Sequence, residues 1–327
     1  MAYPSEVIGI VGPGRMGRGI ALAFAYAGHP VYLIDLKPRQ PAALQAVAGE
    51  ARYEMLADLE LLVHVDALSA SDIVPTLERV RFASHSESQQ ALAACSTIFE
   101  AVPEILDAKR DCFAVIGEHA PASALVASTT STMTADLLAS LLAHPHRFVN
   151  AHWLNPAHLM PLVEISPAVQ TSSDTATRLR ELLVSIGKVP VVCKSSPGFI
   201  VPRIQALAMN EAARMVEEGV ATPEEIDRAV RVGFGLRFGV LGLLEFIDWG
   251  GSDILHHASR FLADNVDPHR FAAAGIVERN TLASRRGLRD GAGFYDYAAV
   301  DIGQYRLARL TQFVALLRHH DLMPRRA

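Results

Sequence analysis

The 327-residue sequence has only three cysteines, no run of basic residues and no long apolar run. The cysteines are scattered and odd in number, so we expect no disulfide framework, no metal site and a reducing, cytoplasmic location. The net charge of −5 offers no surface for a polyanion, so we expect no nucleic-acid partner. No apolar stretch approaches about 18 residues and the first residues carry no leader pattern, so we expect neither a membrane span nor a signal peptide.

Half of the residues are hydrophobic, and the chain is longer than one typical domain. Two domains with substantial cores are therefore expected. Residues 1–194 alternate short apolar runs with helical segments, which is typical of an α/β Rossmann-type doubly wound sheet. From residue 195 the strand-like runs stop and helical periodicity takes over. We predict an α/β domain at 1–194 and an all-α C-terminal domain at 195–327.

The opening of the chain carries the most specific pattern. An apolar run at residues 7–11 leads into Gly12-Pro13-Gly14-Arg15-Met16-Gly17, which has the G-x-G-x-x-G spacing. Gly12 would allow a tight turn, Gly14 would let a pyrophosphate approach the backbone, and Gly17 would let the next helix lie close to the strand. The pattern predicts that this loop holds the phosphates of a dinucleotide.

A second apolar run, residues 31–34, ends in Asp35. A carboxylate at this place accepts hydrogen bonds from a ribose 2′-hydroxyl and repels a 2′-phosphate. The cofactor predicted from the residues is therefore NAD rather than NADP, a preference that the nearby Arg39 could soften. The alternative is a Rossmann-like unit that holds no dinucleotide.

Polar residues gather where two further apolar runs end. Glu100 and Glu104 bracket one such end, Lys109 follows on the next helix, and a run of hydroxyl residues at 128–132 stands at the other. Doubly wound sheets bind ligands at the carboxyl ends of their strands, so we expect both segments beside the cofactor. An exposed Glu104–Lys109 ion pair is an equal alternative. The hydroxyl run could also simply cap a helix.

His152 stands at the end of the apolar run 147–151, and Glu164 lies twelve residues on in the next strand-like run. The two side chains can meet across such strands. The carboxylate would then orient the imidazole and stabilise its protonated form, as suits a general base. Because the chain has thirteen histidines, a satisfied, semi-buried His152 is the simpler interpretation from the residues alone.

Taken together, the motifs resemble the NAD-dependent 3-hydroxyacyl-CoA dehydrogenase family, including its lambda-crystallin, L-gulonate 3-dehydrogenase and carnitine dehydrogenase branch. The resemblance covers roughly residues 6–297. The segments that carry it are residues 12–28 with Asp35, 100–104 with Lys109, 128–131, 152–156 with Glu164, 196–201 and 291–297.

The resemblance implies an enzyme that oxidises a secondary 3-hydroxy group to a ketone, on a 3-hydroxyacyl-CoA or a small 3-hydroxy acid. It implies that His152 is the catalytic base, that Glu164 is its partner and that Ser131 binds the reacting oxygen. It also implies a homodimer formed through a helical substrate and dimerisation domain. The alternative class is a non-catalytic, crystallin-like protein that binds NADH. The residues implied to bind NAD are Gly12, Pro13, Gly14, Arg15, Met16, Gly17, Asp35, Ala101, Val102, Glu104, Lys109 and Asn155, of which Asn155 also places the substrate.

Other substrate positions depart from the acyl-CoA enzymes. Pro202 stands where they have an asparagine of the substrate site, and proline offers no side-chain donor; Thr129 likewise replaces an asparagine. The segment 234–242 resembles the lambda-crystallin and carnitine dehydrogenase branch instead. Its Arg237 could anchor a substrate carboxylate, in its own chain or across a dimer interface, or be an ordinary surface arginine.

Overall fold

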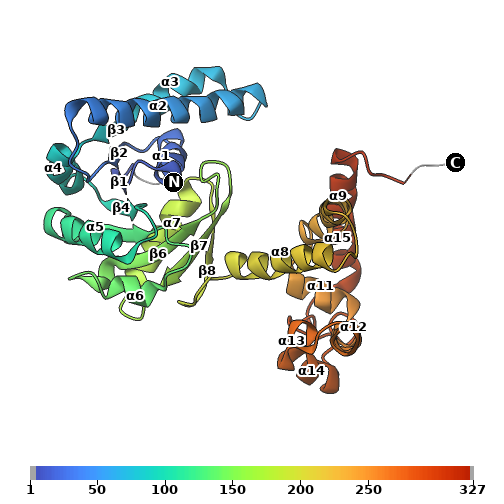
Figure 1. Cartoon of the computed structure of the whole chain (residues 1–327). Coiled ribbons are helices and arrows are strands. Elements are labelled where there is room, and N and C mark those ends of the chain that lie inside the picture. Colours follow the sequence, from blue (N-terminus) through green and yellow to red (C-terminus); the bar gives the residue numbers. More distant parts are fainter. Residues whose placement is uncertain (1–4, 325–327) are drawn as a thin grey trace. The chain divides into compact units, whose positions relative to one another are not determined.

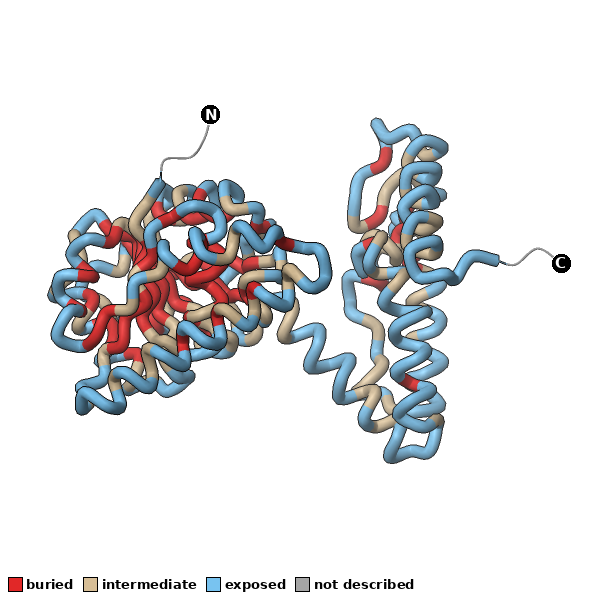
Figure 2. The backbone as a smooth tube through the Cα atoms, turned by 90° about the horizontal axis from the view of Figure 1, so that it is seen from above, coloured by how far each residue is buried: buried red, intermediate tan, exposed pale blue. Residues whose placement is uncertain are grey.

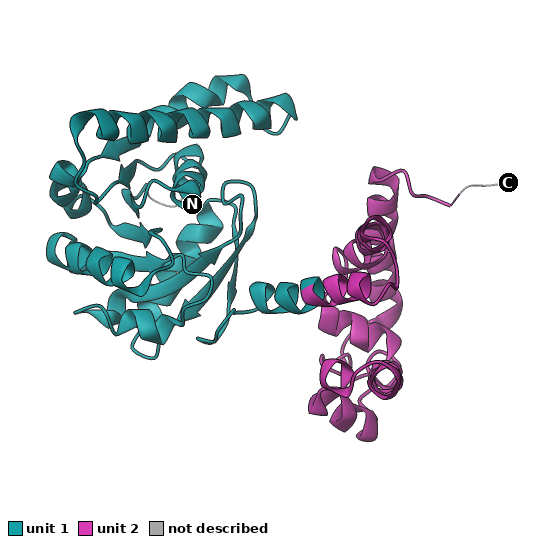
Figure 3. Cartoon of the chain, viewed as in Figure 1, with its two compact units in different colours: residues 1–209 teal, residues 210–327 magenta. Residues whose placement is uncertain are grey.

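The computed structural model describes residues 5–324 and divides into two compact units, residues 1–209 and 210–327 (Figure 3). The division falls inside helix α8 (Val201–Glu217). The domain boundary predicted between residues 194 and 195 lies before this helix.

Unit 1 is built on an eight-stranded sheet in the order β3-β2-β1-β4-β5-β6-β7-β8 (Figure 1). All neighbouring strands run parallel except β6 and β7. The strand order reverses at β1, which lies between β2 and β4, and such a reversal opens a crevice at the carboxyl ends of the strands. The strands are β1 (Ile8–Val11), β2 (Val31–Ile34), β3 (Val80–Ala83), β4 (Thr97–Glu100), β5 (Leu125–Ser128), β6 (Phe148–Trp153), β7 (Leu162–Pro167) and β8 (Val189–Val192).

Helices cover both faces of this sheet. Ile8 and Ile10 of β1 belong to a core that includes side chains of α1, α2, α3 and α7, whereas Val11 belongs to a second core with α4, α5 and α6. Figure 2 shows the buried residues concentrated along the strands. Burial on both sides explains why the central strands are continuous apolar runs, as predicted. The helices of unit 1 are α1 (Arg15–Tyr26), α2 (Pro41–His64), α3 (Ile73–Glu78), α4 (Ser88–Ala93), α5 (Leu106–His119), α6 (Ala135–Ala139) and α7 (Ser173–Ser185), with 3₁₀ turns η1 (Ala70–Asp72), η2 (His85–Glu87) and η3 (Pro145–Arg147).

Unit 2 is helical, as predicted for the C-terminal part of the chain. Its last helix, α15, has no buried residue, and Leu307 and Leu310 on it are exposed. After α8, the elements are α9 (Pro223–Ala229), the π-helix η4 (Val230–Gly235), α10 (Leu236–Phe238), α11 (Leu243–Gly250), α12 (Ser252–Asn265), α13 (Pro268–Phe271), α14 (Gly275–Leu282) and α15 (Ile302–His319).

A buried carboxylate organises the non-helical segment 284–301 of unit 2. Asp248 of α11 is 1% exposed and accepts hydrogen bonds from the N–H groups of Phe294 and Tyr295 and from the Tyr297 hydroxyl. A Cβ at Gly293 would lie 2.1 Å from the Asp248 carboxylate, so only glycine fits there. The aromatic segment 291–297 therefore wraps one buried acid.

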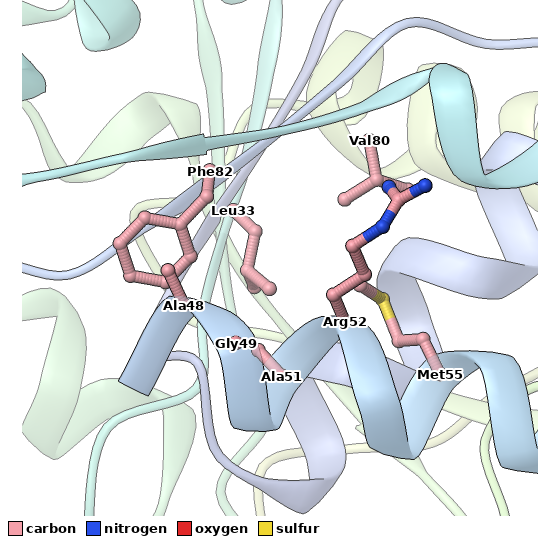
Figure 4. Close-up of a pocket in the computed structure, with 8 residues that line it drawn as sticks. All are labelled: Leu33, Ala48, Gly49, Ala51, Arg52, Met55, Val80 and Phe82. Atoms are coloured by element: carbon pink, nitrogen blue, oxygen red, sulfur yellow. The ribbon is translucent and has the colours of Figure 1, made fainter. Parts of the chain in front are cut away.

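Part of unit 1 is less tightly packed. A hollow of about 320 Å³ lies between α2 and strands β2 and β3 (Figure 4). Its α2 side carries small residues, including Gly49, and a Cβ at Gly49 would meet no other atom within 4 Å. The lining residues are Leu33, Ala48, Gly49, Ala51, Arg52, Met55, Val80 and Phe82.

We expect the substitution Gly49→Ala to stabilise the protein. Alanine is more favourable than glycine inside a helix by about 1 kcal/mol, and its methyl group enters open space. In a unit of this size that gain corresponds to a rise in Tm of about 2–4 °C, measured by circular dichroism. Gly117→Ala in α5 is the matched control, since its Cβ is equally unobstructed but lies away from the hollow. A lower Tm for Gly49→Ala alongside a higher Tm for Gly117→Ala would contradict the prediction.

Candidate active site

The glycine loop after β1 has the geometry of a phosphate cradle. Gly12 has φ +112°, and a Cβ there would lie 2.6 Å from the Ala101 carbonyl oxygen. A Cβ at Gly17 would lie 1.9 Å from the Gly12 carbonyl oxygen, so α1 packs directly on the loop. A Cβ at Gly14 would meet nothing within 4 Å. The loop therefore packs tightly against the protein at Gly12 and Gly17, and it leaves space for a ligand at Gly14.

The N-terminus of α1 is suited to an anion. Gly14 is its N-cap and makes no side-chain cap, and the first turn contains no acidic residue. The first N–H groups of a helix lack intrahelical partners and carry the positive end of its dipole. These residues fit the pyrophosphate of a dinucleotide.

Asp35 follows β2 and is 2% exposed. It accepts hydrogen bonds from the Lys37 N–H at 3.2 Å and from the Arg39 guanidinium. Arg39 is thus the ion-pair partner of Asp35 and is not an independent cation beside it. The carboxylate expected to face the ribose is in place at the end of β2.

The pairing of β6 with β7 brings His152 and Glu164 together. The two residues are directly opposite in the antiparallel register, and His152 Nδ1 lies 2.8 Å from Glu164 Oε2. Their exposed fractions are 6% and 0%. The prediction that β6 ends at residue 151 is wrong by two residues, because the pairing with β7 continues through Trp153.

Both oxygens of Glu164 are engaged. While Oε2 faces His152, Oε1 accepts hydrogen bonds from the N–H groups of Ile200 and Val201 at 3.0 and 2.8 Å. The Phe199 ring stacks on the imidazole, with centroids 5.6 Å apart and planes inclined by 25°. The His152 ring is therefore held at Nδ1 and on one face, which leaves Nε2 as the nitrogen available for proton transfer.

Ser131 lies in the segment after β5. Its N–H donates to Glu104 Oε1 at 3.2 Å, and its hydroxyl has no partner among residues 5–324. The neighbouring Thr132 donates to the same oxygen through its N–H and its hydroxyl, as Thr130 does through its hydroxyl. The hydroxyl run thus binds Glu104 and does not cap the next helix: the cap of α6 is Thr134.

Lys109 is 1% exposed, so the alternative of an exposed Glu104–Lys109 ion pair is wrong. The Lys109 Nζ lies 2.9 Å from Glu100 Oε1 and 3.2 Å from Glu104 Oε2. Burial raises the pKa of Glu104, but hydrogen bonds from Thr130 and Thr132 and the charge of Lys109 outweigh it and bring the pKa below its ordinary value. Glu100 is fully buried and also accepts from Ser128 Oγ at 2.6 Å.

Glu100 was not assigned a role from the sequence. The available signal was a carboxylate that ends an otherwise apolar, buried strand, where a charge has to be paired. Its partner Ser128 lies 28 residues away in the chain and is brought beside it by the β4–β5 register.

The structure places the other predicted site residues without testing their roles. Ala101 and Val102 follow β4, where the Val102 N–H donates to Glu100 Oε1 at 2.8 Å. Asn155 is exposed in the loop after β6, and Pro202 lies in the first turn of α8. Arg237 lies in unit 2, with its guanidinium 4.9 Å from the centre of the Phe246 ring. Its contact with a substrate stays a prediction.

Residues 5–324 contain neither a metal-binding cluster nor a membrane-spanning helix. No group of three or more histidine, cysteine, aspartate or glutamate side chains is arranged there to bind a metal ion. None of the helices in this range combines the length and the apolar character needed to cross a bilayer. The three cysteines are free, and Cys95 and Cys112 are buried.

Family models cover most of the chain. Residues 7–196 match the 3-hydroxyacyl-CoA dehydrogenase NAD binding domain, and residues 198–297 match the 3-hydroxyacyl-CoA dehydrogenase C-terminal domain.

Individual relatives agree with this match. The chain is 31% identical over 312 residues to 5-formyl-3-hydroxy-2-methylpyridine 4-carboxylate 5-dehydrogenase of Mesorhizobium japonicum, covering 95% of this chain and 97% of the other. It is 33% identical over 295 residues to 3-hydroxyadipyl-CoA dehydrogenase of Escherichia coli, covering 90% of this chain and 59% of that longer one. The solved structure of a 3-hydroxyacyl-CoA dehydrogenase from Archaeoglobus fulgidus is similar with a TM-score of 0.74 and 29% identity, covering 97% of this chain and 100% of the other.

The glycine loop and the order of the strands thus agree with the family models, which match both the N-terminal and the C-terminal part of the chain. The chain belongs to the 3-hydroxyacyl-CoA dehydrogenase family, and it is an NAD-dependent oxidoreductase that acts on CH–OH groups.

Proposed function

We propose that this protein oxidises a secondary 3-hydroxy group to a ketone, with His152 as the general base. The observation that carries the proposal is the buried contact of 2.8 Å between His152 Nδ1 and Glu164 Oε2. Because Nδ1 faces the carboxylate, Nε2 takes the proton of the substrate hydroxyl. NAD, when bound, accepts the hydride from the carbinol carbon.

Two further groups support this chemistry. The negative charge of Glu164 stabilises the imidazolium that forms when His152 takes the proton, and in the reverse direction that imidazolium returns the proton to the carbonyl oxygen. The unpartnered Ser131 hydroxyl donates to the same oxygen. The non-catalytic, crystallin-like alternative is not favoured, because such a role requires no buried base and carboxylate pair.

The substrate is an acyl-CoA thioester or a smaller hydroxy acid. Pro202 removes a side-chain donor at a position implied to bind the acyl-CoA substrate, which favours the smaller acid. The name of the M. japonicum relative, whose chain is matched over 97% of its length, also refers to a small pyridine carboxylate. A panel of L-3-hydroxybutyryl-CoA, L-gulonate, carnitine and small aromatic or aliphatic hydroxy acids, followed by NADH absorbance, separates the two classes.

We also propose a homodimer formed through unit 2 and a cytoplasmic location. The dimer is supported by large apolar side chains that stay exposed on unit 2, among them Phe261 at 67%, Leu282 at 79% and Leu307 at 65%. Large apolar side chains that stay exposed are common at protein–protein interfaces. The location is supported by the free, buried Cys95 and Cys112.

Replacing His152 with glutamine should lower kcat by about 10²–10⁴-fold, the usual contribution of a general base. Binding of NADH should be unchanged, because the side chain acts on the hydroxyl proton. Steady-state kinetics on the best substrate of the panel and fluorescence titration with NADH measure the two effects. His64→Gln, at the exposed end of α2, is the control and should keep wild-type kcat. Near-wild-type turnover by His152→Gln would show that another group is the base.

Replacing Asp35 with alanine should weaken NAD binding by about 10–100-fold, the loss expected for hydrogen bonds to a charged group. The binding of NADP should improve relative to NAD, because Arg39 loses its partner and the negative charge is gone. Fluorescence titrations with both reduced cofactors give the ratio, and Tm shows whether the variant is folded. An unchanged preference for NAD in a folded variant would exclude Asp35 as the determinant.

Light scattering coupled to size-exclusion chromatography should give twice the chain mass of 35.4 kDa. Introducing arginine at both Leu307 and Leu310 should shift the mass toward that of a single chain, since two charges would have to be buried. The control is Gln312→Arg on the same helix, a polar and exposed position. A monomeric wild-type protein would contradict the homodimer.

A further inference from the structure

The Lys109 ammonium lies between two carboxylates, those of Glu100 and Glu104. An ammonium group carries three N–H donors. The Nζ atom lies 2.9 and 3.0 Å from the two oxygens of Glu100 and 3.2 Å from Glu104 Oε2. The side chain is 1% exposed.

The two oxygens of Glu104 have different partners. Oε2 faces Lys109, whereas Oε1 accepts from four donors on three successive residues: Thr130 Oγ1, Ser131 N, Thr132 N and Thr132 Oγ1. Lys109 thus fixes the carboxylate from one side, and the carboxylate holds the backbone of the hydroxyl segment from the other.

Glu100 secures the start of the same segment. Its Oε2 accepts from Ser128 Oγ at 2.6 Å, and the Thr130 N–H lies 3.3 Å from that hydroxyl oxygen. The side-chain amide of Asn150 on β6 donates to the Thr130 carbonyl at 3.4 Å. The segment is therefore held by hydrogen bonds at residues 128, 130, 131 and 132. Among residues 5–324, the Ser131 hydroxyl itself has no partner.

We propose that Glu104 is a positioning residue that aims the Ser131 hydroxyl at the reacting oxygen, and that Lys109 holds Glu104 in place. The inference rests on the proposed function, in which Ser131 binds that oxygen. Removing Glu104 frees the N–H groups and hydroxyls of 130–132 to take other partners, so Ser131 loses its fixed direction while its side chain is intact.

A double-mutant cycle with Glu104→Ala and Ser131→Ala tests the link. Ser131→Ala should lower kcat by about 10²–10³-fold, the loss typical of one donor to a reacting oxygen. Glu104→Ala should lower kcat by about 10²-fold, as a displacement of about 1 Å can do. The double variant should be no slower than Ser131→Ala alone. Glu104→Gln keeps one acceptor oxygen and should therefore retain most of the wild-type kcat. This variant replaces Glu104→Ala in the test if the alanine variant does not fold.

The control for the loss of a carboxylate is Glu87→Ala. Glu87 likewise accepts from a loop N–H and a hydroxyl, both of Ser84, but it follows the outer strand β3. We expect its removal to lower Tm and to leave kcat unchanged. A loss of kcat in Glu104→Ala without one in Glu87→Ala assigns the effect to the hydroxyl segment.

The double-mutant cycle distinguishes a failure of the proposed function from a failure of the positioning role of Glu104. If Ser131→Ala alone keeps wild-type kcat, the role of Ser131 in the proposed function is wrong. If Ser131→Ala is slow and Glu104→Ala multiplies that loss in the double variant, the proposed function stands and the positioning role of Glu104 is overturned. If Glu104→Ala keeps kcat and weakens only NADH binding, Glu104 is a cofactor ligand.

Discussion

A buried carboxylate must be paired or hydrogen-bonded, and this requirement shapes both units of the protein. Glu100, Glu164, Asp35 and Asp248 are each no more than 2% exposed. Glu100, Glu164 and Asp248 gather donors from other segments and lose stabilising partners if one of those segments shifts, whereas the donors to Asp35 belong to Lys37 and Arg39 of its own loop. The loss of one donor from a buried charge costs more than the bond itself is worth, so these four acids fix the local arrangement around them.

Three of the four acids lie where a ligand-binding crevice is expected in a doubly wound sheet. Asp35 follows β2 and Glu100 is the last residue of β4, and these two strands lie on either side of β1. Glu164 is positioned by the antiparallel pair β6 and β7. Glu164 has a second effect, because its Oε1 binds the N–H groups of Ile200 and Val201. The carboxylate that orients His152 therefore also fixes the beginning of α8. A substitution at Glu164 would disturb both the orientation of His152 and the backbone of residues 200–201, where α8 begins.

The strands could be predicted because they follow from local pattern. The residues alone allow the His152–Glu164 contact but favour a satisfied, semi-buried histidine, and it is the family resemblance that points to the pair. The burial of Lys109 could not be predicted, because spacing alone does not tell on which face of α5 a side chain lies. Glu100 and Ser128 meet only through the β4–β5 register, which depends on the whole sheet. Likewise the hollow beneath Gly49 results from how α2 packs, which periodicity does not specify.

The cofactor preference follows from a pair of residues and not from Asp35 alone. In the sequence, an arginine four residues after the acid suggests a second, opposing influence, since a guanidinium attracts a 2′-phosphate. The guanidinium of Arg39 is instead bound to the Asp35 carboxylate. A 2′-phosphate would have to displace that carboxylate from its partner while lying next to its negative charge. Arg39 thus holds the Asp35 carboxylate in place, and its guanidinium can bind a 2′-phosphate only if this ion pair separates.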